Sequence, residues 1–313
     1  MVPGTPGSWQ GRFARLSLEP APGADKARQG TTTSEADTTA TLPDLDLQID
    51  RFAFHGRDLG QVRVAADNVG TDGHRWHVRE LSIVNRDAAL SAHGSWEPVN
   101  GGTRRRTTLD VSVEVHDAGG LLGRLGFNDV VAGGKGHVKG SVGWAGAPFS
   151  YDVAQLDAHA GVALDEGRFL QTDNTAGRLL GLLSLQTLAR AATFSEGNLF
   201  AAGFAWDTLR SEVSVGGGVA RIDSFQLHGA SATAVLSGTA DLVRERADLR
   251  AVIVPHVDAS GAALLAGLAV NPVLGAGAFL AQWLLQKPIS EALTMQYAVT
   301  GPWSGPQVTR IDR

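Results

Sequence analysis

The chain has 313 residues, no cysteine, 43% hydrophobic residues and a net charge of -5 with a pI near 6.0. The length admits one large domain or two ordinary ones. The lack of cysteine excludes disulfides, thiol catalysis and thiolate metal sites. The acidic balance argues against nucleic-acid binding, which normally needs a basic face, so no nucleic-acid partner is predicted.

Residues 1–40 are predicted to be a disordered or linker-like segment. Most of this stretch is polar and rich in threonine, with few bulky apolar side chains, so burial cannot offset its ordering entropy. The pattern admits one short strand, around Phe13–Leu18. Met1–Pro20 has no apolar run of the length that a signal peptide requires. Either the protein is cytosolic or a targeting part precedes this sequence.

From Leu42 onward, apolar and polar side chains alternate with the period of a β-strand. The clearest run is 109–115, in which the apolar residues share one face and Asp110, Ser112 and Glu114 the other, as in antiparallel sheets. About fourteen strands are expected, and a sheet of that size usually curls. The residues predicted to face an apolar groove are Leu45, Leu47, Ile49, Leu109, Val111, Val113, Val115, Val213 and Val215.

A leucine-rich segment interrupts the alternation and predicts a helix near 174–192. Asp173, Asn174 and Thr175 offer N-capping side chains. The leucines that follow spread around much of the helix instead of forming one stripe. The favoured interpretation is a helix that plugs one end of the β core, and the alternative is a helix that caps a ligand-filled groove. The candidate capping residues are Leu179, Leu182, Leu183 and Leu185.

The second apolar segment, Ala259–Gln286, carries no charged residue. It is longer than the ~18 residues that indicate a membrane span, but Asn271–Pro272 interrupts it. Two short helices near 259–287 fit better. A packed helical hairpin is favoured, a membrane-surface or lid element comes second, and a true span comes third. The candidate membrane-contact residues are Leu264, Leu265, Phe279, Trp283 and Leu284.

No motif for catalysis, cofactor binding or metal binding stands out. GxSxG, HExxH and Walker-type patterns are absent from the sequence. His74 and His77 lie three residues apart in a strand-like segment and so point to opposite faces, whereas two ligands of one metal must share a face. The sequence therefore predicts no enzyme, no cofactor and no metal site.

The predicted fold is mainly β. It is a long curled antiparallel sheet that forms an apolar groove, with a short inserted helix and a C-terminal helical hairpin. Residues 41–313 are expected to form one continuous domain.

Four stretches resemble, in order along the chain, the C-terminal region of YhdP-type AsmA-like envelope proteins. They are GRFLQTDNTAGRLLGLLSLQTLAR at 167–190, NLFAAGFAWDTL at 198–209, Pro255–Val257, and LTMQYAVTGPWSGPQV at 293–308. Agreement of several separate blocks is more specific than any single block. The resemblance covers most of residues 42–313 and implies either a C-terminal portion of a larger, membrane-anchored protein or a truncated gene product.

That family is similar to bridge-like lipid-transfer proteins of the Gram-negative envelope. The resemblance implies a periplasmic or envelope location and a lipid-transfer module that shields phospholipid acyl chains in its groove between the inner and outer membranes. Phospholipid acyl chains are the expected ligand, and a membrane surface is a second candidate partner. The alternative is a non-enzymatic structural or assembly protein of the envelope that binds a protein partner, not identified by the sequence, without carrying lipid.

Overall fold

The structure is a computed structural model. It describes residues 7–18, 43–54, 56–69, 75–99, 102, 104–148, 152–170, 204–230, 232–255, 295–303 and 305–311.

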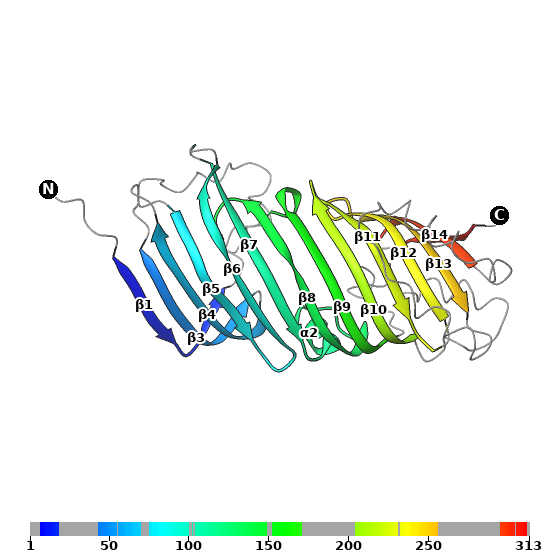
Figure 1. Cartoon of the computed structure of the whole chain (residues 1–313), viewed down its shortest axis with the longest axis horizontal. Coiled ribbons are helices and arrows are strands. Elements are labelled where there is room, and N and C mark those ends of the chain that lie inside the picture. The colour runs from blue at the N-terminus through cyan, green and yellow to red at the C-terminus, as the bar shows by residue number, and fades with distance from the viewer. Residues whose placement is uncertain are drawn as a thin grey trace. The chain divides into compact units, whose positions relative to one another are not determined.

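Strands dominate the described residues (Figure 1). The elements, in chain order, are β1 (Ser8–Phe13), β2 (Leu16–Leu18), β3 (Asp44–Phe54), β4 (Arg57–Val69), β5 (Arg75–Val84), β6 (Ala88–Pro98), β7 (Arg105–Val115), α2 (Ala118–Arg124), β8 (Val131–Ala145), the 3-10 turn η2 (Val153–Gln155), β9 (Asp157–Phe169), β10 (Phe204–Gly216), β11 (Val219–His228), β12 (Ala232–Asp241), β13 (Arg246–Pro255), β14 (Met295–Pro302) and β15 (Gln307–Arg310).

The strands join into one 15-stranded sheet whose order follows the chain. The order is β1-β3-β4-β5-β6-β7-β8-β9-β10-β11-β12-β13-β14-β15, and β2 pairs with β3 beside β1. From β3 onward the paired registers are antiparallel, whereas β1 and β2 run parallel to β3. The prediction of a mainly β fold built on one antiparallel sheet is confirmed.

The alternating pattern explains which face of each strand is buried. In β7, Leu109 and Val115 are buried, whereas Asp110 and Glu114 are exposed. Cross-strand partners in an antiparallel sheet share a face, so Leu47 on β3 and its partner Val64 on β4 continue one apolar face. The polar side chains lie on the opposite face.

Part of the stretch predicted to be linker-like forms strands. β2 falls within the short strand that the sequence pattern admits around Phe13–Leu18, and β1 precedes it. Trp9 and Phe13 on β1 are 65% and 45% exposed. Backbone pairing with β3 therefore holds β1 in place more than burial does, and a hydrophobic pattern does not reveal such a strand.

The chain divides into two compact units. Unit 1 comprises Met1–Val113 and Ser141–Asp152, and unit 2 comprises Glu114–Gly140 and Val153–Arg313. Unit 2 contains large side chains that are fully buried: Leu227, Val235, Leu236, Leu249 and Val299 are each at most 1% exposed.

The sheet face of unit 1 is less deeply covered. Several of its buried apolar positions are alanines, including Ala66 and Ala92, whereas the larger Leu47, Val64 and Leu81 are only half-buried. These side chains therefore remain partly open to solvent.

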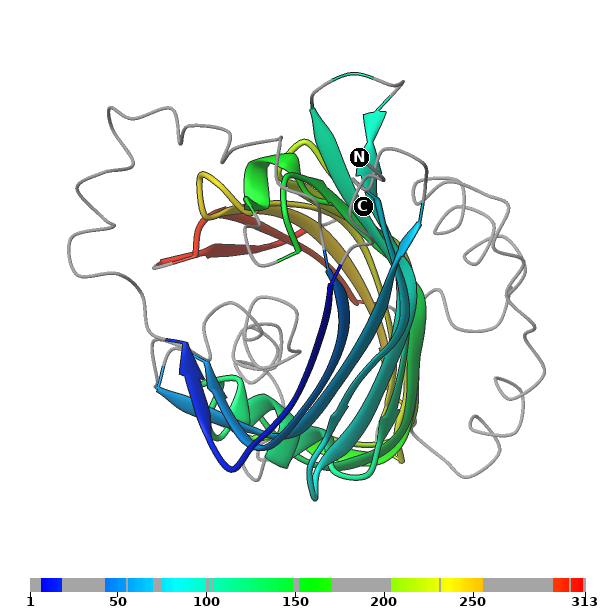
Figure 2. The same cartoon turned by 90° about the vertical axis from the view of Figure 1, so that its left-hand side faces the viewer.

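The strands of unit 2 bend, and α2 lies on their concave side (Figure 2). The hairpin between β10 and β11 turns at Gly217 and Gly218, whose φ values are 58° and 75°. Two consecutive positive φ values are those of a tight two-residue hairpin turn, in which glycine is unstrained. Glycines between two runs of alternating apolar residues, here Val213 and Val215 before them and Val219 after them, are the sequence pattern of such a hairpin.

The predicted helices near 174–192 and 259–287 lie outside the described residues. The same holds for the candidate capping leucines and the candidate membrane-contact residues. Within the described ranges, no helix has the length and apolar character needed to cross a bilayer.

Candidate functional site

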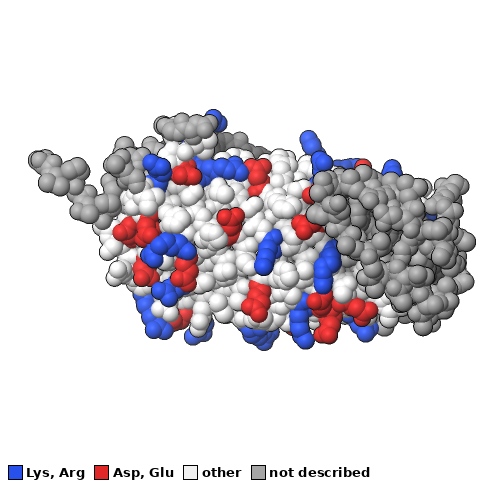
Figure 3. All heavy atoms as spheres, viewed as in Figure 1, with Lys and Arg blue, Asp and Glu red and all other residues white. Residues whose placement is uncertain are grey.

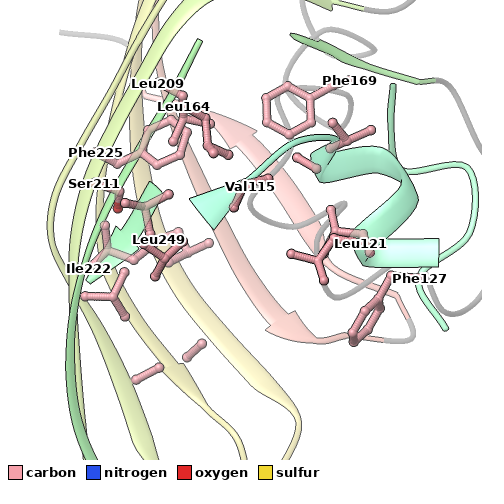
Figure 4. A pocket seen from close by; sticks show the side chains of 18 of the residues that line it. Val115, Leu121, Phe127, Leu164, Phe169, Leu209, Ser211, Ile222, Phe225 and Leu249 are labelled. Carbon is pink, nitrogen blue, oxygen red and sulfur yellow. The ribbon is translucent and has the colours of Figure 1, made fainter. Parts of the chain in front are cut away.

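Unit 2 contains an apolar cavity of about 490 Å³ between the sheet and α2. Figure 4 shows the sheet on one side of the cavity, with Leu164, Leu209 and Leu249, and the helix with Leu121 on the other. The volume falls within the range of about 300–1,000 Å³ that is usual for small-molecule sites.

The sheet supplies one wall of the cavity through alternate positions of neighbouring strands. The lining residues here include Leu164 on β9, Leu209 and Val213 on β10, Ile222 on β11 and Leu249 on β13. Leu209 pairs with Leu164, and Val213 pairs with Ile222. Because paired residues share a face, the period-two pattern of the sequence places aliphatic side chains side by side on this wall.

The opposite wall is α2, which has well-defined caps. Asp117 caps its N-terminus, because the side-chain carboxylate accepts a 3.1 Å hydrogen bond from the Gly120 N–H. At the C-terminus, Gly126 has φ 93° and donates to the Gly123 carbonyl. The Phe127 N–H donates to the Leu122 carbonyl, which completes a Schellman motif.

Side chains at the C-terminal cap of α2 line the cavity. Leu122 and Phe127, the two residues joined by the Schellman hydrogen bond, both line it together with Leu121. Gly119 allows the helix to approach β8 closely, because a Cβ there would overlap the Val131 carbonyl oxygen. The local sequence thus fixes both where α2 ends and how near it lies to the sheet.

Phe169 and Trp206 form one boundary of the cavity, with ring centroids 6.1 Å apart. Trp206 is 2% exposed and lies against Gly167, where a Cβ would overlap its Cζ2 atom. Its buried Nε1 has no hydrogen-bond partner among the described residues. The only hydroxyl that the described strands contribute to the lining is that of Ser211, which donates to the Ser224 carbonyl at 2.9 Å and is thereby satisfied.

The charged side chains of these strands lie on the opposite face of the sheet. Glu212 and His159 approach within 3.4 Å, and Arg210 and Asp165 within 2.7 Å. Figure 3 shows a face on which charges of both signs are interspersed over the described strands. The described lining of the cavity contains no acid, base or cation, so it offers an apolar ligand burial from water and no group for proton transfer.

Two of the residues predicted to face a groove, Val115 and Val213, line this cavity. Val215 lies two residues beyond Val213 on β10, outside the described lining. The remaining six candidates belong to unit 1, on β3 and β7, and are not part of the cavity. They are Leu45, Leu47, Ile49, Leu109, Val111 and Val113.

Several lining residues were not singled out by the sequence. Phe225 and Leu249 occupy apolar runs whose strand pattern is visible, but the pattern does not tell which of the two faces carries a cavity. Leu121 and Phe127 belong to the α2 region, where the sequence pattern predicts no helix. The signals that could have found α2 are the capping residue Asp117 and the glycine at position 126.

The described strands form a chain-ordered sheet with an apolar cavity beside it, and comparison with known sequences shows the family of the chain. The family model described as "YhdP protein" matches residues 2–308, and the chain belongs to this family. A relative from Escherichia coli strain K12, "Intermembrane phospholipid transporter YhdP", is 26% identical over 272 residues, which cover 87% of this chain and 21% of the relative. The chain thus spans about a fifth of that protein's length. No solved structure matches.

Proposed function

We propose that this chain is a phospholipid-transfer module of the Gram-negative envelope. In this proposal, acyl chains enter the apolar cavity of unit 2 and lie along the apolar sheet faces while they pass between the inner and outer membranes. The cavity between α2 and the sheet is the observation that carries the proposal. The name of the Escherichia coli relative and the shared family support it.

The free energy of burial explains why such a surface suits lipid transfer. A sixteen-carbon acyl chain gains about 12 kcal/mol on leaving water, at roughly 0.8 kcal/mol per methylene. A protein that moves lipid must supply most of this gain throughout the path. An aliphatic wall such as that of Leu164, Leu209 and Ile222 does so without polar groups that would have to be desolvated.

Lipid analysis of the purified protein tests the proposal. The chain is produced in the periplasm of a Gram-negative bacterium, and co-purifying lipids are extracted and quantified by mass spectrometry. We expect phospholipid in about stoichiometric amount with the wild type. Val213→Asp is expected to reduce it severalfold, because a carboxylate in the cavity must be desolvated by any acyl chain that enters.

Ser214→Asp is the matched control, since Ser214 is the next residue on β10 and its partners Arg221 and His159 are on the opposite face. It adds the same charge outside the cavity and should leave the bound lipid unchanged. Circular dichroism confirms that both variants are folded. A wild-type protein without phospholipid would contradict the proposal and favour the alternative of a structural or assembly protein that binds another protein.

A further inference from the structure

Three tryptophans lie in a row at one end of the strands of unit 1. Trp76 lies at the start of β5, Trp96 near the end of β6 and Trp144 near the end of β8. Because neighbouring strands run in opposite directions, these three positions lie at the same end of the strands. Trp76 is the cross-strand partner of Trp96, and their ring centroids are 5.4 Å apart.

This row lies on the apolar face of the sheet. The register continues from the Trp76–Trp96 pair to Val78 and Gly94 on the same face, and a Cβ at Gly94 would contact the backbone of Leu109 on β7. The aromatic row is therefore the border at which the aliphatic face meets the strand ends. Tryptophan suits such a border because its ring is apolar and its N–H is polar.

The guanidinium of Arg105 lies beside this row of tryptophans. Arg105 is the first residue of β7, and the alternation of that strand places it on the same face as Leu109. Its guanidinium carbon lies 4.4 Å from the centroid of the Trp96 ring, in cation–π geometry. The N–H groups of a guanidinium lie in one plane, in a geometry that can match two phosphate oxygens.

The indole N–H groups of the row differ in their partners. Trp76 donates to the Pro43 carbonyl and Trp144 to the Ala147 carbonyl, both at 2.8 Å. The buried Nε1 of Trp96 has no hydrogen-bond partner among the described residues. A buried donor without an acceptor is costly and unusual in folded proteins, and an oxygen atom from a ligand beside Arg105 would satisfy it.

We propose that Arg105 and Trp96 form a phosphate-binding site for the head group of a phospholipid whose acyl chains lie on the adjoining apolar face of unit 1. The inference rests on the proposed function. Beyond that function, it states where the head group binds and that its phosphate is the group recognised. Arg105 supplies charge-assisted hydrogen bonds to the phosphate, and the Trp96 N–H donates to a phosphate or ester oxygen. The aliphatic residues next to the row, Leu109 and Val111, contact the acyl chains.

A competition between two lipids with identical acyl chains tests the site. The full chain is incubated with vesicles that contain phosphatidylglycerol and diacylglycerol in equal amounts, and the bound lipids are measured by mass spectrometry. The wild type should be enriched in the phosphate-bearing lipid by roughly tenfold, the scale of a charge-assisted hydrogen bond. Arg105→Gln should bring the ratio close to one while diacylglycerol binding persists.

Arg106→Gln is the matched control. Arg106 is the adjacent residue of β7, and its side chain lies over Gly143, on the face opposite Arg105. The control makes the same change of charge and should retain the wild-type ratio. Inorganic phosphate in excess should also leave that ratio unchanged, because a free anion lacks the acyl chains that hold the lipid beside Arg105.

The outcomes separate this site from the function on which it rests. A wild type that binds both lipids equally would overturn the head-group site and leave acyl-chain binding intact, and this measurement does not depend on how any variant folds. An equal loss of preference in Arg105→Gln and Arg106→Gln would overturn it as well. If excess inorganic phosphate abolished the preference of the wild type, the site would be one for free phosphate, and the head-group assignment would be wrong. A wild type that binds neither lipid would overturn both proposals.

Discussion

The two units use the same strand chemistry to make different surfaces. In unit 2, α2 faces the aliphatic side of the sheet across an apolar cavity, and the largest core residues are almost fully buried. In the described part of unit 1, no helix covers the sheet, and residues such as Leu47 and Val64 stay half-buried. Alternation alone does not decide between a closed core and an open apolar face. What packs against each face decides it.

The largest expected contrast between the units is in stability. Leu236→Ala in unit 2 should lower the free energy of unfolding by about 2–5 kcal/mol, because it leaves a cavity among fully buried neighbours. Leu47→Ala in unit 1 should cost about 1 kcal/mol, because a half-buried side chain loses less transfer free energy and leaves no closed void. Urea unfolding measures both, and equal losses would refute the contrast.

A smaller effect is expected at the aromatic boundary of the cavity. Gly167→Ala places a methyl group against the Trp206 indole, which must shift. We expect a loss of about 1–3 kcal/mol from this overpacking, together with less bound lipid. Gly305→Ala is the control, since a Cβ there meets no atom within 4 Å. Thermal unfolding of both variants checks the prediction, which fails if their midpoints are the same.

The smallest expected effect concerns the helix that distinguishes unit 2. Asp117→Ala removes the N-cap of α2 and should cost about 1 kcal/mol. Because α2 forms one wall of the cavity, lipid recovery should fall with it. Asp117→Asn retains a capping side chain and should behave much like the wild type. If the Ala variant bound as much lipid as the wild type, α2 would not be needed for retention.

The fold was largely predictable because strand periodicity is a local property. The alternation in 109–115 and the glycines at 217 and 218 are enough to predict a strand and a hairpin, and the structure has both. The exposed strand β1 is not predictable in this way, since its backbone pairing with β3 leaves no hydrophobic pattern. The helix α2 has only seven residues, too few for helical periodicity to emerge from a glycine-rich sequence.

The site was less predictable than the fold. Val115 and Val213 could be assigned to an apolar face from their own strands. The cavity depends on how that face meets α2 and on the close approach of Trp206 to Gly167, which are distant in sequence. The pairing of Arg105 with Trp96 likewise joins two strands through a register that composition does not reveal.

The chain-ordered sheet also has a consequence for folding. Most strands pair with their neighbours in sequence, so hairpins such as β10–β11 and β11–β12 close over short loops. Such contacts form quickly, because little chain entropy is lost at each step. The pairings of β1 with β3, of β9 with β10 and of β13 with β14 instead join strands separated by long connections. Assembly can therefore advance strand by strand as the polypeptide emerges from the ribosome, and we expect these three pairings to be its slowest steps.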